Sequence, residues 1–147
     1  MGIEAKFTRS DVKKVYDNFV DGVKRQQIKR LQYLGEICLN EARMNGNYQD
    51  QTGNLRSSIG YTVFVDGVAV HSMFEQTKEG SQGVRAGEVL ANRVGKGTTG
   101  VCLVVTAGMD YALYVESKGY NVLSSAEHLA ERELPRMLEN LISKIKE

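Results

Sequence analysis

Residues 57–74 read SSIGYTVFVDGVAVHSMF, a pattern that predicts a β-hairpin. Ile59, Tyr61 and Val63 alternate with smaller or polar residues, as in a half-buried strand. The pair Asp66-Gly67 follows at once, and an Asp-Gly pair between two β-prone runs is a strong short-range hairpin signal. We therefore expect two antiparallel strands joined by a tight turn.

A long helix is predicted before the hairpin. Apolar residues recur every three or four positions between Ser10 and Ala42. Ser10 is placed to cap the first turn, and Asn45-Gly46 supplies a stop signal. A helix of this length is longer than a small isolated domain can cover. Either it bends near residues 22–27 or one half packs on a neighbouring subunit, because a protruding half could not bury its own apolar stripe.

After the hairpin, residues 76–100 are rich in glycine and charge, so we expect a flexible surface insertion there. A short helix over 85–94 is the alternative within it. Residues 101–107 predict a third strand that is covered on both faces. A short fourth strand near 120–123 is also considered.

A second amphipathic helix closes the chain. Its apolar stripe runs to Ile145, Ser124 or Ser125 is placed to cap it, and Pro135 is expected to kink or divide it. The elements predict an α+β fold with a long N-terminal helix, an antiparallel sheet of three to four strands and a C-terminal amphipathic helix packed on the sheet. A chain of 147 residues fits one domain, so we expect a single domain over 1–147.

Composition excludes several classes of protein. The formal net charge is +1, so the chain as a whole does not attract phosphate backbones or anionic membranes. Cys38 and Cys102 lie far apart, which predicts two reduced thiols and neither a zinc site nor a disulfide scaffold. Residues 1–10 lack the apolar run of a signal peptide, and no stretch is long enough to span a bilayer. We expect a cytosolic protein with no membrane partner.

No catalytic, cofactor or metal site is predicted. The stretch 95–99, GKGTT, departs from the phosphate-binding loop at two required positions and favours a flexible glycine loop. His71 and His128 have no neighbour at a metal-ligand spacing. Asp110 and Glu116 could approach one another, but ordinary surface charge is the favoured interpretation.

One basic group stands out on the first helix. Arg25 and Lys29 share a helix face, and Lys24 and Arg30 flank it. They could present a positive ridge to phosphates or to an acidic partner. A solvated helix face is the favoured interpretation, and no interleaved aromatic residues support base stacking.

Two short motifs carry a resemblance to a known family. Residues 52–59 read TGNLRSSI, which resembles the "TGxLRxSI" signature of a tail-component family of long-tailed bacteriophages. Residues 111–116 read YALYVE and resemble the family's "YAxYVE" element. Order, spacing and terminal helices also match, so the resemblance covers residues 10–145. The chain departs from the family pattern just before Gly53 and at residues 117–120.

The resemblance implies a function. Members of the family act at the neck of the virion as head-tail joining or tail completion proteins. It implies a virion structural protein, assembled in the cytoplasm of the host bacterium, whose copies form a hexameric or dodecameric ring. The partners would be the portal or connector, the tail tube or tail terminator proteins, and passing DNA in non-specific contact. No enzymatic activity is expected.

The matching residues are the assembly-related candidates: Thr52, Gly53, Leu55, Arg56, Ile59, Tyr111, Tyr114 and Glu116. Thr52 and Gly53 would turn the chain sharply from helix into sheet, and Leu55 and Ile59 would enter the core. Tyr111 and Tyr114 would supply contact area, and Glu116 could pair with Arg56.

Two alternatives stay open at this stage. The chain could be a tail terminator or another minor tail protein, which caps the tube and does not join it. In a different class, it could be a metal-dependent phage accessory hydrolase that uses Asp50, Asp110 or Glu116 with a divalent cation.

Overall fold

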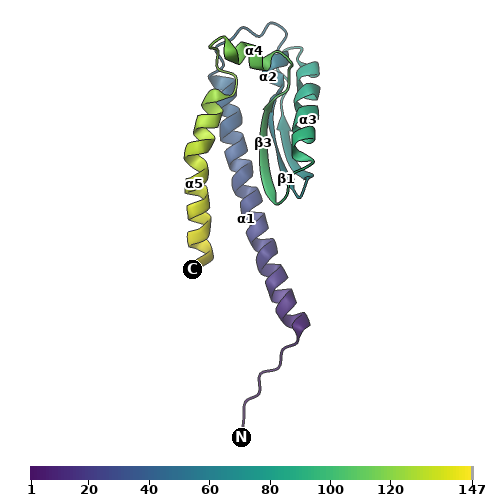
Figure 1. The fold of residues 1–147 in the computed structure, drawn as a ribbon, viewed down its shortest axis with the longest axis vertical. Helices are drawn as coiled ribbons and strands as arrows, with labels where there is room; N and C mark the ends of the chain where they lie inside the picture. Colours follow the sequence, from purple (N-terminus) through teal and green to yellow (C-terminus); the bar gives the residue numbers. More distant parts are fainter. Residues whose placement is uncertain (147) are drawn as a thin grey trace.

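A computed structural model describes residues 1–146 of the chain. The fold is α+β, with one long N-terminal helix, a three-stranded antiparallel sheet and a long C-terminal helix (Figure 1). The elements in chain order are α1 (Arg9–Met44), α2 (Asn54–Ser57), β1 (Ile59–Val65), β2 (Val68–Phe74), α3 (Ser81–Gly95), β3 (Val101–Ala107), α4 (Ala112–Ser117) and α5 (Ser124–Lys146). The predicted fold class is confirmed.

The α1 helix runs without interruption through 36 residues. At the helical rise of 1.5 Å per residue, its length is about 54 Å. Its cap is Thr8 and not Ser10: the Thr8 hydroxyl accepts from the amide of Asp11, and the Asp11 carboxylate accepts from the amide of Thr8. Only the C-terminal part of the helix is buried, from Leu34 to Ala42. The N-terminal part extends well beyond the rest of the molecule (Figure 1).

The sheet has the strand order β2-β1-β3, with β1 antiparallel to both neighbours. The hairpin predicted from Asp66-Gly67 is confirmed, and both turn residues have positive φ angles, 50° and 81°. Because β1 is the central strand of the sheet, it is buried along almost its whole length. The fourth strand considered near 120–123 does not form, because these residues lie in the connection from α4 to α5.

Helices cover both faces of the sheet. Ile59, Tyr61 and Val63 pack in the main core with α1. Phe64 points the other way and packs with Ala91 of α3. The sheet is therefore the middle of three layers, with α1 and α5 on one side and α3 on the other (Figure 1).

The α3 helix corrects the expectation of a surface loop over 76–100. A helix of 15 residues occupies most of that segment, and the alternative helix over 85–94 lies within it. Its buried residues are all small and recur every four positions: Gly83, Gly87, Ala91 and Gly95. A Cβ at Gly87 or Gly95 would overlap the ring of Phe74 or Phe64, respectively, so this helix packs on the sheet by close approach of its backbone.

The α5 helix is a single helix through Pro135, so of the two expected outcomes, a kink or a division into two segments, the division does not occur. It lies along α1, and the Arg30 guanidinium donates to the side-chain amide oxygen (Oδ1) of Asn140 at 3.2 Å between the two helices. Its early residues Ala126 and Ala130 belong to the main core with the sheet. Farther along, a groove opens between α5 and β3.

Candidate assembly interface

The first motif, residues 52–59, forms the corner between α1 and the sheet. Gly53 has a φ of +81°, and the Thr52 hydroxyl accepts from the amide of Asn54 at 3.3 Å, as expected for the sharp turn. The Asp50 carboxylate accepts from the amides of Leu55 and Arg56 at 3.3 and 2.8 Å. These bonds satisfy the first amides of α2 and hold the corner closed.

The side chains of this motif are mainly structural. Leu55 and Ile59 are buried in the core, as predicted. Arg56 donates to the carbonyl oxygen of Gly46 at 2.8 Å, and its guanidinium lies 5.2 Å from the centre of the Tyr48 ring. Burial raises the pKa of Tyr48 to about 12, although Arg56 opposes that shift.

Glu116 of the second motif does not pair with Arg56. Its carboxylate accepts from the amides of Val122, Leu123 and Ser124 at 2.6, 3.0 and 2.8 Å, and also from the Ser124 hydroxyl. Burial alone would raise the pKa of Glu116, but these bonds together hold it below its ordinary value. The expected ion pair is wrong because the start of α5 lies closer to the carboxylate and offers several donors.

The start of α5 is thus capped from outside the helix. The Glu116 carboxylate accepts a hydrogen bond from the amide of Ser124, and the side-chain oxygen of Asn121 accepts one from the amide of Ser125 at 3.0 Å. The predicted roles of Ser124 and Ser125 as caps are wrong, since their hydroxyls bind the two capping side chains. The amide of Asn121 also donates to the Asn47 side chain, which ties this connection to the end of α1.

The two motifs meet at one end of the molecule, which we call the motif end and define as residues 48–59 and 111–124. The α2 and α4 helices lie together there (Figure 1). Burial and the nearby Asp50 carboxylate both raise the pKa of Tyr111. Leu113 is 80% exposed and Tyr114 is 63% exposed. The Lys118 ammonium lies 5.2 Å from the centre of the Tyr114 ring. The motif end therefore combines a closed internal network with an exposed aromatic surface.

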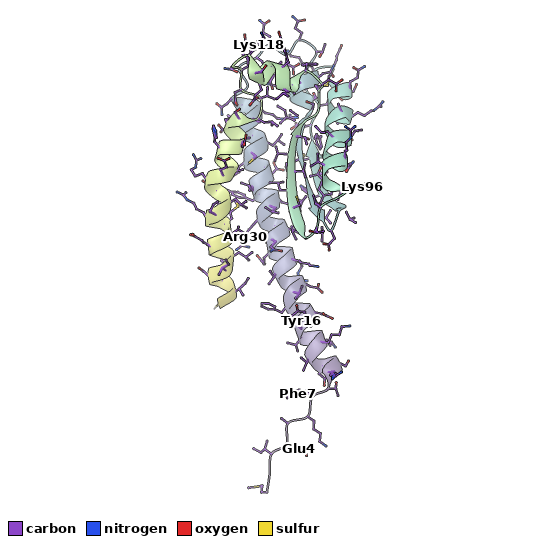
Figure 2. All side chains as sticks on the ribbon, viewed as in Figure 1. Glu4, Phe7, Tyr16, Arg30, Lys96 and Lys118 are labelled. Atoms are coloured by element: carbon purple, nitrogen blue, oxygen red, sulfur yellow. The ribbon has the colours of Figure 1, made fainter. Side chains whose placement is uncertain are left out.

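The second exposed surface is the arm, which we define as residues 9–23 of α1. Val12, Val15, Tyr16 and Phe19 lie on one face of this segment, and Val15, Tyr16 and Phe19 are 71%, 65% and 56% exposed. Figure 2 shows Tyr16 on the part of α1 that projects beyond the rest of the fold, with Phe7 farther out. The predicted stripe is present. Val12, Val15 and Tyr16 are all more than half exposed, whereas Phe19 shares a hollow with Leu141 and Ile145 of α5.

The groove, the third surface, lies between α1, α5 and β3. Its volume is about 440 Å³. The walls are mostly apolar and include Leu31, Leu34, Leu103, Val105, Leu134 and Leu138. On its α5 side, Leu138 is 46% exposed. Sequence reasoning missed the groove because no single element shows it.

The basic residues predicted on α1 do not act as one ridge. Arg25 and Lys29 are exposed, Lys24 is half-buried, and Arg30 donates to Gln26 and to Asn140 of α5. Lys29 and Arg30 line a shallow surface hollow with two cations of α5, Arg136 and Lys144. The patch is therefore built from two helices, and only their packing reveals the second pair.

A partly buried polar cluster also escaped the sequence analysis. The Tyr61 hydroxyl donates to the Glu36 carboxylate at 2.6 Å and lies 3.0 Å from Nε2 of His71. The pKa of Tyr61 is raised, mainly by burial and to a smaller extent by the hydrogen bond to Glu36. The three residues come from α1, β1 and β2, so the cluster joins the helix to the hairpin.

The carboxylates considered for hydrolysis do not form a metal centre in the described chain. Within residues 1–146, no three acidic, histidine or cysteine side chains lie close enough together to hold a metal ion. Asp50 and Glu116 bind backbone amides, and Asp110 is exposed. None of the helices in that same part of the chain is both long and apolar enough to cross a bilayer.

The chain matches no protein-family model, and it matches neither a curated protein nor a solved structure. The features of the chain that bear on function are therefore its two motifs and its exposed surfaces.

Proposed function

We propose that this protein is a structural subunit of the head-tail connection of a tailed bacteriophage or prophage, where its copies form a closed ring. The partners in this proposal are the portal or connector on one side and the tail tube or tail terminator on the other. The protein acts in virion assembly and performs no turnover. Its motif residues, Thr52 to Ile59 and Tyr111 to Glu116, support the proposal through their resemblance to the neck family.

The observation that carries the proposal is the amount of uncovered surface. The accessible surface of the chain is 9,986 Å². A compact monomer of its 16.3 kDa mass exposes about 7,500 Å². The excess of about 2,500 Å² is on the scale that subunits of obligate oligomers bury against one another. Apolar arm residues account for part of it, so association is a direct way to shelter them.

The motif residues have a consistent role in this proposal. Asp50 and Glu116 brace the motif end by accepting hydrogen bonds from backbone amides, and Gly53 forms its turn at a φ of +81°. Tyr114 and Leu113 are exposed at that end. Aromatic and aliphatic anchors on a preorganised surface bind a partner at a lower entropic cost than flexible ones. We place the contact with a portal or tail protein at this end.

The surface hollow between α1 and α5 is the part we assign to DNA. Lys29, Arg30, Arg136 and Lys144 line it together with one acidic residue, Glu133. Such a patch neutralises phosphates without reading base sequence. In a ring it would face the channel through which DNA passes.

Localisation in the intact particle tests the proposal. The chain would carry a small epitope tag at its N-terminus, distant from the motif end, and purified virions would be imaged with a labelled antibody. We expect label at the junction of head and tail, and loss of the gene should give filled heads and separate tails. Label elsewhere on the particle, or particles that join normally without the protein, would contradict it. Tails of uncontrolled length would instead indicate the terminator.

A further inference from the structure

We infer that the arm of one copy binds in the groove of the next copy, so that each subunit is both donor and acceptor. This inference rests on the proposed ring and specifies how its subunits meet. Arm and groove are the residues defined above, 9–23 of α1 and the apolar channel between α1, α5 and β3.

The arm has the form of a helix that binds in a groove. Val12, Val15, Tyr16 and Phe19 follow the spacing i, i+3, i+4 and i+7, which places all four side chains on one stripe. The helix is capped at Thr8 and is therefore formed before it binds. A preformed helix loses little backbone entropy on docking.

The groove offers a matching apolar surface. Leu134, Leu138, Ile142 and Ile145 of α5 are all at least one third exposed, and they follow one another at three- or four-residue spacing. Two of them, Leu134 and Leu138, line the groove opposite Leu103 of β3. A helix laid there would contact α5 and the sheet together.

The arm cannot fill the groove of its own chain. It continues the straight run of α1, which itself forms one wall of the groove, and the helix is continuous from Arg9 to Met44 (Figure 1). Turning the arm back would break hydrogen bonds of the helix in its middle. A second copy supplies the same arm without that cost.

Charge favours one orientation. Arg9 and Lys13, one turn apart and both exposed, line the surface next to Val12 and Tyr16. Glu127 and Glu131 are exposed and one turn apart at the start of α5, and Glu127 lies beside Val105 of the sheet. An arm parallel to α5 brings the two basic residues to the two acidic ones.

The spacing along the two helices agrees with this orientation. The distance along the arm from the basic pair to the centre of Val15, Tyr16 and Phe19 is about 9 Å, at a rise of 1.5 Å per residue. The distance along α5 from the acidic pair to the centre of Leu134 and Leu138 is about 10 Å at the same rise per residue. Both contacts can therefore form together. Because arm and groove are different surfaces, the association is head-to-tail, and it closes into a ring when the rotation permits.

Complementation between two variants tests the inference. Tyr16→Asp disables the arm and leaves the groove intact, whereas Leu138→Asp disables the groove and leaves the arm intact. Both sites are more than 40% exposed, so both variants should fold, which thermal unfolding would verify. Val89→Asp, at an exposed site on α3 in the opposite layer, is the matched control. Sedimentation velocity between about 1 and 100 µM would measure the mass of each protein.

We expect the wild type and Val89→Asp to associate, and each of the two interface variants to bind other copies about 100-fold more weakly. An equimolar mixture of the two variants should form a dimer of twice the 16.3 kDa chain mass, because one intact arm meets one intact groove. Charge reversal gives a second test: Lys13→Glu should weaken association, and Glu131→Lys in the same chain should restore it.

Three outcomes would overturn the inference. They are a wild type that remains at 16.3 kDa, an assembled wild type that neither variant disturbs, and a mixture that stays monomeric. The neck proposal is decided separately by localisation in the virion. A ring found at the neck with undisturbed variants would retain the function and remove this mode of contact.

Discussion

Replacing Glu116 by alanine is expected to destabilise the fold by about 3 kcal/mol at pH 7. The carboxylate accepts from three backbone amides, those of Val122, Leu123 and Ser124, and from one hydroxyl. Hydrogen bonds to a charged acceptor contribute more than neutral ones, but half-buried amides recover part of the loss by binding water. About 1 kcal/mol for each amide is the resulting magnitude.

The effect should depend on pH in a defined direction. The folded-state pKa of Glu116 lies below the ordinary value of 4.5. A carboxyl group with a lowered pKa stabilises the fold fully above its unfolded pKa, and the contribution is lost as pH falls through the folded pKa. The difference between wild type and Glu116→Gln should therefore be constant from pH 7 to about pH 5.5 and should shrink below pH 4.5.

Urea unfolding followed by circular dichroism measures both effects. Glu139→Gln, at an exposed site on α5, is the control and should change the free energy of unfolding by less than about 0.5 kcal/mol. A loss of 3 kcal/mol corresponds to a fall of about 9 °C in Tm for a chain of this size. If Glu116→Ala also cost less than about 0.5 kcal/mol, the capping role derived from the hydrogen bonds would be refuted.

Three further outcomes are expected. Gly53→Ala should lower the free energy of unfolding in urea by about 2 kcal/mol or more, because the φ of Gly53 is +81° and a Cβ there would meet the backbone of the β2–α3 connection. Gly97→Ala is the control and should be nearly neutral, because a Cβ at Gly97 faces open space. Equal effects of the two substitutions would contradict this prediction. Tyr61→Phe should cost about 2 kcal/mol, since a carboxylate and an imidazole lose their partner, and a stabilised variant would refute the cluster's role. The double variant Lys29→Glu, Arg136→Glu should lower the affinity for duplex DNA at low salt, measured by fluorescence anisotropy, and unchanged binding would remove the assigned DNA surface.

Elements with large, periodic apolar residues were predictable from sequence. The hairpin over 57–74 has alternating side chains and an Asp-Gly turn, and its strands form where expected. Both terminal helices have stripes at helical spacing, and both form. In each case the signal is local, because the spacing of apolar residues within the segment identifies the element, even in the arm, where those residues remain exposed.

The α3 helix shows why other parts escaped. Its buried positions are Gly83, Gly87, Ala91 and Gly95, which give almost no apolar periodicity. Small residues at every fourth position become a signal only when a sheet is known to lie against them, since they permit close approach and contribute little area. A glycine-rich segment with spacing of four can therefore indicate a closely packed helix as well as a loop.

The candidate site was predictable only in part. Gly53, Leu55 and Ile59 behave as the sequence indicated, because turn geometry and burial are properties of a short segment. The partner of Glu116 depends on where the start of α5 lies, and the cations Arg136 and Lys144 join the basic patch only through packing of α5 on α1. Such contacts between distant segments have no local pattern.

Amide hydrogen exchange of the arm tests most directly whether neighbouring copies shelter it. The comparison is between the wild type and Leu138→Asp, which has the same arm but an impaired groove. We predict that amides of residues 9–23 exchange at least about 10-fold more slowly in the wild type, since an isolated projecting helix opens readily and a docked one does not. Equal exchange rates in the two proteins would contradict the account.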